Sequence, residues 1–237
     1  STGIKIECQE RPIQHIGLGS GTQLNLSIEE LVSKFFGISN YANIFNRTYR
    51  SGIGINSYKK GGFIIDCPKK DLNDSRVIFK SNFPKSWKII LLFDNKKKGL
   101  HGKTEKSFFL PSNSNNLRKQ LSDILVNEII PAVSYRDFNV FAKGLTEFQK
   151  INYLFYSSIQ KSMYLSSDIA KVIKDISKLF KVGVGQSSWG PTSYIFVNSK
   201  KDLKDILPVL NQTISMYNNL SYDVVSVKNN GRKLTTI

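Results

Sequence analysis

The sequence predicts an α+β fold in which a mixed first part is followed by a helix-rich second part that returns to strands. Three observations support this prediction: short apolar strands before residue 94, apolar residues at helical spacing from about residue 113, and apolar strands again after residue 192. The 237 residues are enough for two domains of ordinary size. Because Pro84 lies between two expected strands, we predict domains at 1–83 and 84–237.

Two kinds of periodicity define the elements of the first part. Residues 4–8 alternate apolar and charged side chains as a strand does, and further strands are expected at 63–66, 76–80 and 88–93. An amphipathic helix follows the glycine-rich stretch 17–23. Its apolar side chains lie on one face at helical spacing: Leu24, Ile28, Leu31, Val32 and Phe35.

The second part contains helices whose boundaries the sequence marks. Stripes of apolar residues in 117–125 and 138–148 predict two of them. Ser166 or Ser167 is the expected N-cap of a third, whose apolar face consists of Ile169, Val172, Ile173, Ile176 and Phe180. Ser199 begins a fourth, which Pro208 is expected to kink or shorten.

The stretch Gly17-Leu18-Gly19-Ser20-Gly21-Thr22-Gln23 is the first candidate binding site. Three glycines in five positions let the backbone approach a ligand closely, and the following helix directs free N–H groups and the positive end of its dipole at that ligand. Phosphate is the group that such a loop binds best. The alternative is a glycine turn that begins a helix for steric reasons only.

A later glycine cluster, residues 183–191, is the second candidate. One interpretation is a tight turn between a helix and a strand, with Trp189 in the core. The other is a wall of an active site, in which hydroxyl groups and backbone N–H groups meet a phosphate or a ribose. In that case Trp189 provides a stacking surface for an aromatic ring.

The net charge of +16 is carried by lysines that are spread along the chain. We therefore expect a solvated surface that attracts anionic substrates rather than a dedicated nucleic-acid-binding face. The longest apolar run is far too short to span a bilayer. Cys8 and Cys67 are expected to be reduced thiols in a cytoplasmic protein.

The motif GLGSGTQ at 17–23 resembles the phosphate loop of the GHMP kinase superfamily. Together with GQSSWGP at 185–191, it is similar to the archaeal β-ribofuranosylaminobenzene 5'-phosphate synthases of that superfamily. Residues 50–66 and Asp137-Phe138 fit further blocks of the same family, so the resemblance covers nearly the whole chain. It implies a GHMP-kinase-like architecture, with an N-terminal mixed α/β domain and a C-terminal ferredoxin-like α/β sandwich.

The resemblance implies a phosphoribosyltransferase that joins phosphoribosyl pyrophosphate to a ring carbon of 4-aminobenzoate or 4-hydroxybenzoate. Carbon dioxide and pyrophosphate leave, in a step of methanopterin-type cofactor biosynthesis, and Mg²⁺ accompanies the pyrophosphate. Two other functions stay open: an ATP-dependent GHMP-type kinase of small molecules, and a non-catalytic basic relative that binds nucleic acid. Gly54 argues against the kinase, because it stands where kinases that use a catalytic aspartate carry that residue.

On this hypothesis the phosphate cradle consists of Gly17, Gly19, Ser20, Gly21 and Thr22. The opposite wall consists of Gly185, Gln186, Ser187, Ser188 and Trp189. No residues are assigned to the metal.

Three further residues complete the hypothesis. Arg50 and Ser51 bind a second anion, a phosphate or the aromatic carboxylate, although a surface salt bridge is the alternative for Arg50. Asp66, at the end of a strand, is the candidate catalytic acid for contact with a metal or with the positively charged ribose; the alternative is that it caps a turn.

The sequence departs from the superfamily in one further way. Members normally place several strands before the phosphate loop, whereas about one strand precedes it here. We therefore expect an incomplete first sheet with an open edge. The missing strands belong to a longer chain, come from a separate chain, or are lost; the superfamily also suggests a homodimer.

Overall fold

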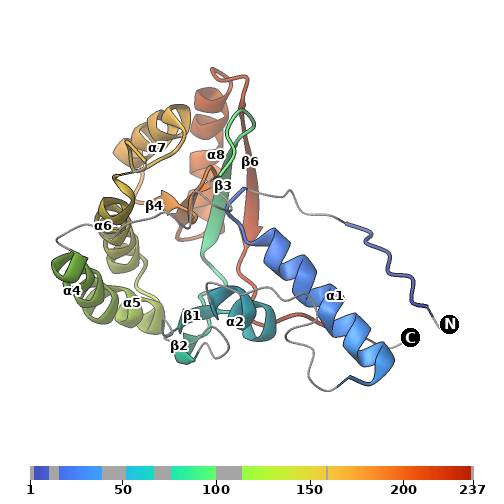
Figure 1. Cartoon of the computed structure of the whole chain (residues 1–237). Helices are drawn as coiled ribbons and strands as arrows, with labels where there is room; N and C mark the ends of the chain where they lie inside the picture. The colour runs from blue at the N-terminus through green and yellow to red at the C-terminus, as the bar shows by residue number, and fades with distance from the viewer. Residues whose placement is uncertain are drawn as a thin grey trace. The chain divides into compact units, whose positions relative to one another are not determined.

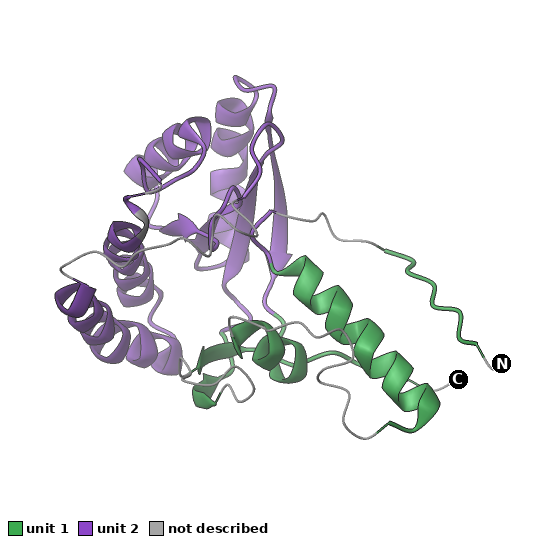
Figure 2. Ribbon diagram, in the orientation of Figure 1, with its two compact units in different colours: residues 1–14, 19–83, 228–237 green, residues 15–18, 84–227 purple. Residues whose placement is uncertain are grey.

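The computed structural model describes residues 3–10, 16–38, 52–66, 76–99, 114–158 and 160–235. The chain forms two compact units (Figure 1; Figure 2). Unit 1 consists of residues 1–14, 19–83 and 228–237, and unit 2 consists of residues 15–18 and 84–227. The units change at the predicted position between residues 83 and 84, and each unit also includes other stretches of the chain.

Unit 2 is built on a four-stranded antiparallel sheet with the strand order β4-β5-β3-β6 (Figure 1). Its strands are β3 (Lys88–Asp94), β4 (Gly183–Gln186), β5 (Ser193–Val197) and β6 (Leu220–Ser226). In the central strand β3, Ile90 is opposite Ile195 of β5 and Val224 of β6. Three of these strands agree with the predicted ones, and β4 adds a strand in the second glycine cluster.

One face of this sheet is covered by α7 (Ser167–Leu179) and α8 (Lys200–Ile214). The buried core between them consists of Ile90, Leu92, Ile169, Val172, Ile173, Ile176, Val184, Ile195, Val197, Ile206 and Leu210. The predicted caps are confirmed, because the hydroxyl of Ser166 accepts from the amide of Ile169 and that of Ser199 accepts from the amide of Asp202. Pro208 does not shorten α8, which continues to Ile214.

The remaining helices of unit 2 form a second layer. α4 (Ser114–Ile124) continues through the π-helical turn η1 (Leu125–Ile129) into α5 (Ile130–Tyr135), and α4 packs against α6 (Phe138–Tyr156). Leu117 of α4 contacts Ile151 and Phe155 of α6 in a small apolar cluster. None of the described helices combines the length and the apolar content that a membrane span requires.

Helix α6 lies against β4 and the aromatic side of the sheet. Strand side chains alternate, so Phe196 of β5 points away from the core formed with α7 and α8. The ring centroid of Phe196 lies 5.2 Å from that of Phe141, which lies 4.6 Å from that of Trp87. Gly183 of β4 permits this packing, because a Cβ atom there would lie 3.0 Å from the Cα atom of Ala142.

Unit 1 contains two helices and a two-stranded antiparallel sheet. Its elements are α1 (Ser20–Phe36), α2 (Gly52–Lys60), β1 (Phe63–Asp66) and β2 (Val77–Ser81). Helix α2 contacts both α1 and β1. The two strands agree with the predicted ones, whereas the helix α2 was not predicted.

The C-terminal stretch of the chain packs in unit 1. The side-chain amide of Asn229 donates to the carbonyl of Phe83 at 2.9 Å and accepts from the Phe83 amide at 2.8 Å. The amide of Arg232 donates to the carbonyl of Tyr58 at 2.7 Å. These bonds join residues 229–232 to α2 and to the end of the β2 segment.

Helix α1 is amphipathic as predicted, but its apolar face is not the buried one. Leu31 and Phe35 are 39% and 52% exposed, whereas Glu29 and Glu30 are 1% and 3% exposed. Periodicity locates an apolar face, but the partners within unit 1 decide which face is buried.

The predicted strand at 4–8 is wrong. The described residues there are exposed and belong to no strand. An alternating pattern stabilises a strand only where a neighbouring strand accepts its hydrogen bonds, and those residues have no strand partner in the described structure.

Candidate functional site

The segment 16–18 lies along the turn that connects β4 to β5 in unit 2. The hydroxyl of Ser187 donates to the carbonyl of Gly17 at 2.7 Å, and the amide of Thr192 donates to the carbonyl of Ile16 at 3.4 Å. Ser187 and Gly17 are 170 positions apart in the sequence. The start of the first glycine cluster therefore meets the second cluster within one unit.

Gly17 is required by this contact. Its φ of 84° lies in the left-handed region, and a Cβ atom there would lie 2.6 Å from the carbonyl oxygen of Ser187 and 2.9 Å from that of Gly190. Both neighbours are backbone atoms, so a side chain at this position can be accommodated only by moving one of the two segments.

The turn is held by its own backbone. The amide of Ser187 donates to the carbonyl of Thr192 at 2.9 Å, and the amide of Gly190 donates to the carbonyl of Ser187 at 2.9 Å. Ser188 and Gly190 have positive φ values of 51° and 68°. Ser188 is exposed at the tip, and Trp189 beside it is half-buried, so part of the indole surface faces outward.

The side chain of Gln186 connects the turn to neighbouring segments of unit 2. Its side-chain oxygen accepts from the amide of Leu165 at 2.6 Å, and its side-chain nitrogen donates to Oε1 of Gln160 at 3.2 Å and to the carbonyl of Ser188 at 3.3 Å. Both amide hydrogens are thus used within the protein, which indicates a supporting role. Gln160 was not predicted from the sequence, because an isolated glutamine belongs to no recognisable pattern.

The chain passes from segment 16–18 into the N-terminus of α1. Gly19 caps this helix with a φ of 69°, no side chain caps it, and its first turn contains no acidic residue. The first hydrogen bond inside the helix runs from the amide of Gln23 to the carbonyl of Gly19 at 3.1 Å. This end of α1 carries a partial positive charge of about half a unit and attracts an anion.

Gly54 of α2 explains how closely the two helices of unit 1 approach. A Cβ atom there would lie 2.9 Å from Cγ2 of Thr22. The carbonyl of Gly54 also accepts from the side-chain amide of Gln23 at 2.9 Å. Since the space is taken by the end of the glycine loop, the position has a steric reason to be glycine.

The buried face of α1 is fixed by Glu30. Its carboxylate accepts from the hydroxyl of Tyr58 at 2.8 Å, from Nε of Arg232 at 2.7 Å and from a terminal guanidinium nitrogen of the same arginine. The hydrogen bond from Arg232 is the main reason that the pKa of Glu30 lies below its usual value, although burial opposes it.

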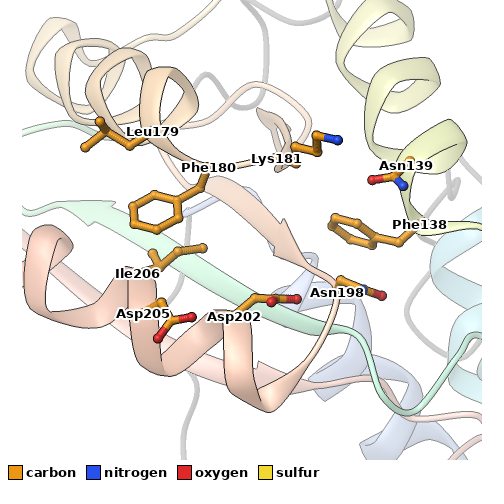
Figure 3. A pocket seen from close by; sticks show the side chains of 9 residues that line it. All are labelled: Phe138, Asn139, Leu179, Phe180, Lys181, Asn198, Asp202, Asp205 and Ile206. Atoms are coloured by element: carbon orange, nitrogen blue, oxygen red, sulfur yellow. The ribbon is translucent and has the colours of Figure 1, made fainter.

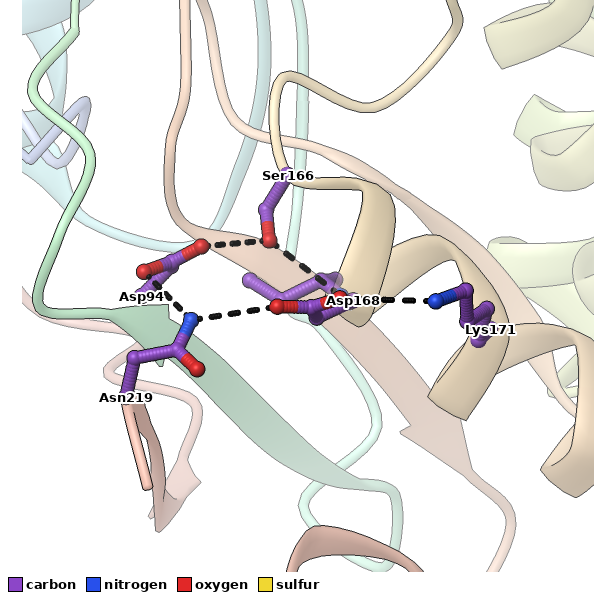
Figure 4. Close-up of polar contacts among 6 residues, drawn as sticks. Asp94, Ser166, Asp168, Lys171 and Asn219 are labelled. Atoms are coloured by element: carbon purple, nitrogen blue, oxygen red, sulfur yellow. Dashed lines mark hydrogen bonds and ion pairs between the residues drawn. The ribbon is translucent and has the colours of Figure 1, made fainter. Parts of the chain in front are cut away.

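A second buried carboxylate, Asp94, joins three elements of unit 2 (Figure 4). It accepts from the hydroxyl of Ser166 at 2.6 Å, from the side-chain amide of Asn219 at 2.9 Å and from the amide of Lys96 at 2.9 Å. Burial raises the pKa of Asp94, but the hydrogen bonds from Asn219, Ser166 and Lys96 outweigh it and leave the pKa below its usual value. This carboxylate connects the end of β3 to the start of α7.

A hollow of about 290 Å³ lies elsewhere on unit 2. Phe138 and Phe180 face it, with Asp202 of α8 beneath them (Figure 3). The carboxylate of Asp202 accepts from the hydroxyl of Ser199 at 2.9 Å, so part of its capacity serves the helix cap. None of the predicted site residues lines this hollow.

Comparison with known proteins decides which family this geometry is related to. The chain is 34% identical over 211 residues to the β-ribofuranosylphenol 5'-phosphate synthase of Methanocaldococcus jannaschii. It is 30% identical over 205 residues to the enzyme of that name from Methanothermobacter thermautotrophicus. Each alignment covers 78% of this chain. The chain is therefore similar in sequence to the β-ribofuranosylphenol 5'-phosphate synthases.

The chain spans 61% of the length of each of these two synthases. A third synthase, from Archaeoglobus fulgidus, is 27% identical over 216 residues, and the chain covers 66% of it. No protein-family model matches the chain.

Solved structures show that this chain has the GHMP-kinase fold. The homoserine kinase of Cytophaga hutchinsonii superposes with a TM-score of 0.66 at 12% identity, over 94% of this chain and 69% of the kinase. The galactokinase of Lactococcus lactis superposes with a TM-score of 0.60 at 11% identity, over 93% of this chain and 68% of that kinase. The predicted α+β fold class is thereby confirmed.

The structure does not bring the other predicted site residues into contact with the segment 16–18 and the β4–β5 turn. Arg50 and Ser51 lie outside the described residues. Asp66 ends β1, where it is opposite Val77 of β2, and α2 contacts both that strand and α1. The space beside Gly185 is filled, because a Cβ atom there would lie 2.4 Å from the hydroxyl of Tyr194. These assignments stay predictions.

Proposed function

We propose that this chain carries part of the site of an enzyme like its synthase relatives, in which a phosphoribosyl donor reacts with an aromatic acid. The relatives' identity of 30% and 34% supports the proposal. The observation that carries it is the hydrogen bond between Ser187 and Gly17, because it joins the two glycine clusters in unit 2.

The donor's phosphate groups are assigned to the stretch Gly17–Thr22. At Gly19 and Gly21 nothing lies within 4 Å of where a Cβ atom would be, so the backbone there is open, and the uncapped end of α1 adds its partial positive charge. The net charge of +16 favours an anionic substrate of this kind.

The name of the relatives' product indicates the aromatic acid. A ribofuranosylphenol keeps a hydroxyl group on its ring. We therefore assign 4-hydroxybenzoate, since 4-aminobenzoate would give a product with an amino group. The half-buried indole of Trp189, at the turn that contacts Gly17, is the proposed stacking surface for the ring.

The reaction exchanges one bond at C1 of the ribose for another. The bond from C1 to pyrophosphate breaks and its electron pair leaves with pyrophosphate, while the ring carbon that carries the carboxylate forms the new bond to C1. Loss of carbon dioxide then returns an electron pair to the ring and restores its aromaticity. Backbone N–H groups around the leaving group stabilise the charge that develops on it.

Mg²⁺ is the proposed cofactor, because it neutralises the pyrophosphate as that group departs. The described residues contain no group of three or more His, Cys, Asp or Glu side chains arranged to hold a metal. We assign the ion mainly to pyrophosphate oxygens together with one or two carboxylates, of which Asp66 is the candidate.

The test is formation of ribofuranosylphenol 5'-phosphate from phosphoribosyl pyrophosphate and 4-hydroxybenzoate with Mg²⁺, measured by mass spectrometry together with pyrophosphate release. Ser187→Ala is expected to lower kcat/KM about tenfold, because it removes the hydrogen bond to Gly17. Ser157→Ala is the matched control, since its hydroxyl donates only to the carbonyl of Leu154 within a helix end.

Two results would contradict the proposal. Phosphorylation of a small molecule by ATP, without use of phosphoribosyl pyrophosphate, would indicate a kinase. Binding of unrelated nucleic acids that falls steeply with salt, without stabilisation by phosphoribosyl pyrophosphate, would indicate the nucleic-acid-binding alternative.

A further inference from the structure

We propose that Gln160 and Gln186 are positioning residues of the candidate site. Their side-chain amides form a buried relay that fixes the backbone of the β4–β5 turn and thereby the orientation of Trp189. The inference rests on the proposed function, which assigns the aromatic ring to the indole of Trp189. It adds the residues that decide how tightly this ring is bound.

The relay connects the segment that follows α6 to the tip of the turn. The side-chain nitrogen of Gln186 donates to Oε1 of Gln160 at 3.2 Å and to the carbonyl of Ser188 at 3.3 Å. The side-chain oxygen of Gln186 accepts from the amide of Leu165 at 2.6 Å. The side-chain nitrogen of Gln160 donates to the carbonyl of Ser162 at 2.6 Å. Every polar atom of the two glutamine side chains therefore has a partner.

Both glutamines are buried, with exposed fractions of 7% for Gln160 and 8% for Gln186. Burial of a side-chain amide is unfavourable unless its polar atoms are paired, whereas an apolar side chain fills the same space without this requirement. A fully paired amide network instead fixes one arrangement of the segments that it joins. The relay therefore points to a role in holding the turn in a particular conformation.

The turn at 187–190 has a backbone conformation that needs such support. The amide of Gly190 donates to the carbonyl of Ser187 at 2.9 Å, which closes a four-residue β-turn. Ser188 has a positive φ of 51°, whereas the φ of Trp189 is not positive. A positive φ at the first central position only is the pattern of a type II′ turn, which normally has glycine there. Serine is disfavoured at this position because of its Cβ atom.

Gln186 provides the contacts that hold this conformation. Its side chain donates to the carbonyl of Ser188 and lies against Gly190, where a Cβ atom would be 2.8 Å from Cδ of Gln186. A residue keeps a disfavoured φ only where its surroundings hold it there. Without the relay, the turn can relax to a common form that lacks a positive φ. This relaxation changes the direction in which the side chain of Trp189 leaves the backbone.

The orientation of Trp189 matters for only one of the two proposed substrates. Its half-buried indole is the proposed stacking surface for the aromatic acid, and stacking depends on the relative orientation of the two rings. The phosphates of the donor are assigned to Gly17–Thr22. The relay is therefore expected to affect KM for the aromatic acid more than KM for the donor, whereas a general loss of stability would not separate the two.

The kinetic test is Gln186→Glu, which keeps the shape of the side chain but removes both donated hydrogen bonds. We expect KM for 4-hydroxybenzoate to rise about tenfold and KM for phosphoribosyl pyrophosphate to change less than about twofold. Gln212→Glu is the matched control, because it makes the same change at an exposed glutamine of unit 2; it is expected to leave both KM values unchanged. Gln160→Met removes the far end of the relay without adding a charge, and is expected to raise KM for 4-hydroxybenzoate about threefold.

The orientation of Trp189 is measured separately by 19F NMR of the chain labelled with 5-fluorotryptophan. The sequence contains two tryptophans, and Trp87 is 1% exposed, so its resonance serves as the internal reference. Gln186→Glu and the uncharged Gln160→Met are both expected to shift the resonance of Trp189 and to leave that of Trp87 in place. Circular dichroism of each variant confirms that the fold is retained.

The proposal is overturned if the resonance of Trp189 stays in place in both variants, or if KM for the aromatic acid rises no more than KM for the donor. A wild-type chain that forms no product contradicts the proposed function instead. The 19F measurement decides whether the relay positions Trp189 in that case also, because it requires no substrate.

Discussion

Gly17 has a backbone conformation and surroundings that favour glycine for two separate reasons. Its φ of 84° is unfavourable for other residues, and carbonyl oxygens of Ser187 and Gly190 occupy the space where a Cβ atom would lie. Gly19 shares the first reason, with a φ of 69°, but nothing lies within 4 Å of a Cβ atom there. Substitutions at Gly17 and Gly19 can therefore distinguish the cost of backbone strain from the cost of steric overlap.

We predict that Gly17→Ala lowers the free energy of unfolding by about 2–3 kcal/mol, the sum of backbone strain and overlap with backbone atoms. Gly19→Ala is expected to cost about 1 kcal/mol, from strain only. Urea denaturation of both variants measures the difference. Equal effects of the two substitutions would show that the contact of Gly17 with the β4–β5 turn does not contribute.

Asp94 gives a pH dependence to the stability of unit 2. In the folded protein the pKa of Asp94 lies below the value of 3.8 expected for the unfolded chain. At pH values between the two pKa values, the unfolded state therefore binds more protons than the folded state. The stabilisation is therefore present above about pH 4 and is lost as the pH falls through the folded pKa.

We predict that Asp94→Asn lowers the free energy of unfolding at neutral pH by about 1–3 kcal/mol, since the amide cannot accept all the hydrogen bonds that the carboxylate accepts. The variant should also lose stability less steeply below pH 4. Urea unfolding at several pH values measures both effects. Asp175→Asn, at an exposed ion pair with Lys178, serves as the control, and an identical acid dependence in Asp94→Asn and the wild type would refute the assignment.

Residue patterns identified the glycines of the candidate site but not the reasons for them. The motif suggested that Gly17 approaches a ligand, whereas the structure gives it a protein neighbour in Ser187. Gln160 and Asn229 were missed, because their roles depend on partners distant in the sequence. Local patterns contain no information on such partners.

At the scale of elements, α6 protects the edge of the sheet at β4. The amide of Val184 donates to the hydroxyl of Thr146 at 3.2 Å, while this hydroxyl donates to the carbonyl of Ala142 at 2.8 Å. An edge strand otherwise offers unpaired backbone groups to other chains. The contact also fixes the strand that leads into the Ser187–Thr192 turn.

We predict that Thr146→Val destabilises the protein by about 1–2 kcal/mol, because the partly buried amide of Val184 loses its acceptor. Thr213→Val is the matched control, since the hydroxyl of Thr213 donates to the carbonyl of Val209 in the same helical manner without serving a strand. Hydrogen exchange at the Val184 amide should accelerate in the first variant. If both variants unfold at the same urea concentration, the bond to β4 has no net effect.

Helix and strand positions were predicted well where the elements lie in a core. α7 has its predicted cap and buried face because Ile169, Val172, Ile173 and Ile176 lie in the buried core of unit 2. The apolar face predicted for α1 is not the buried one, because Glu30 on the other face is held by Arg232 and Tyr58. The strand predicted at 4–8 does not form, because these residues have no strand partner in the described structure. Both cases depend on long-range partners that periodicity does not identify.

At the scale of the whole molecule, the α+β class and the GHMP-kinase fold follow from two motifs and from the order of elements. The structural neighbours confirm this fold at 11–12% identity.

The central claim is that the two glycine clusters jointly hold a phosphorylated ribose. Amide hydrogen exchange of the full chain, with and without phosphoribosyl pyrophosphate and Mg²⁺, tests this most directly. We predict slower exchange in both stretches, 16–22 and 187–192, upon addition of the ligand. Slower exchange in neither stretch, or protection confined to the hollow beside Phe138 and Phe180, would contradict the claim.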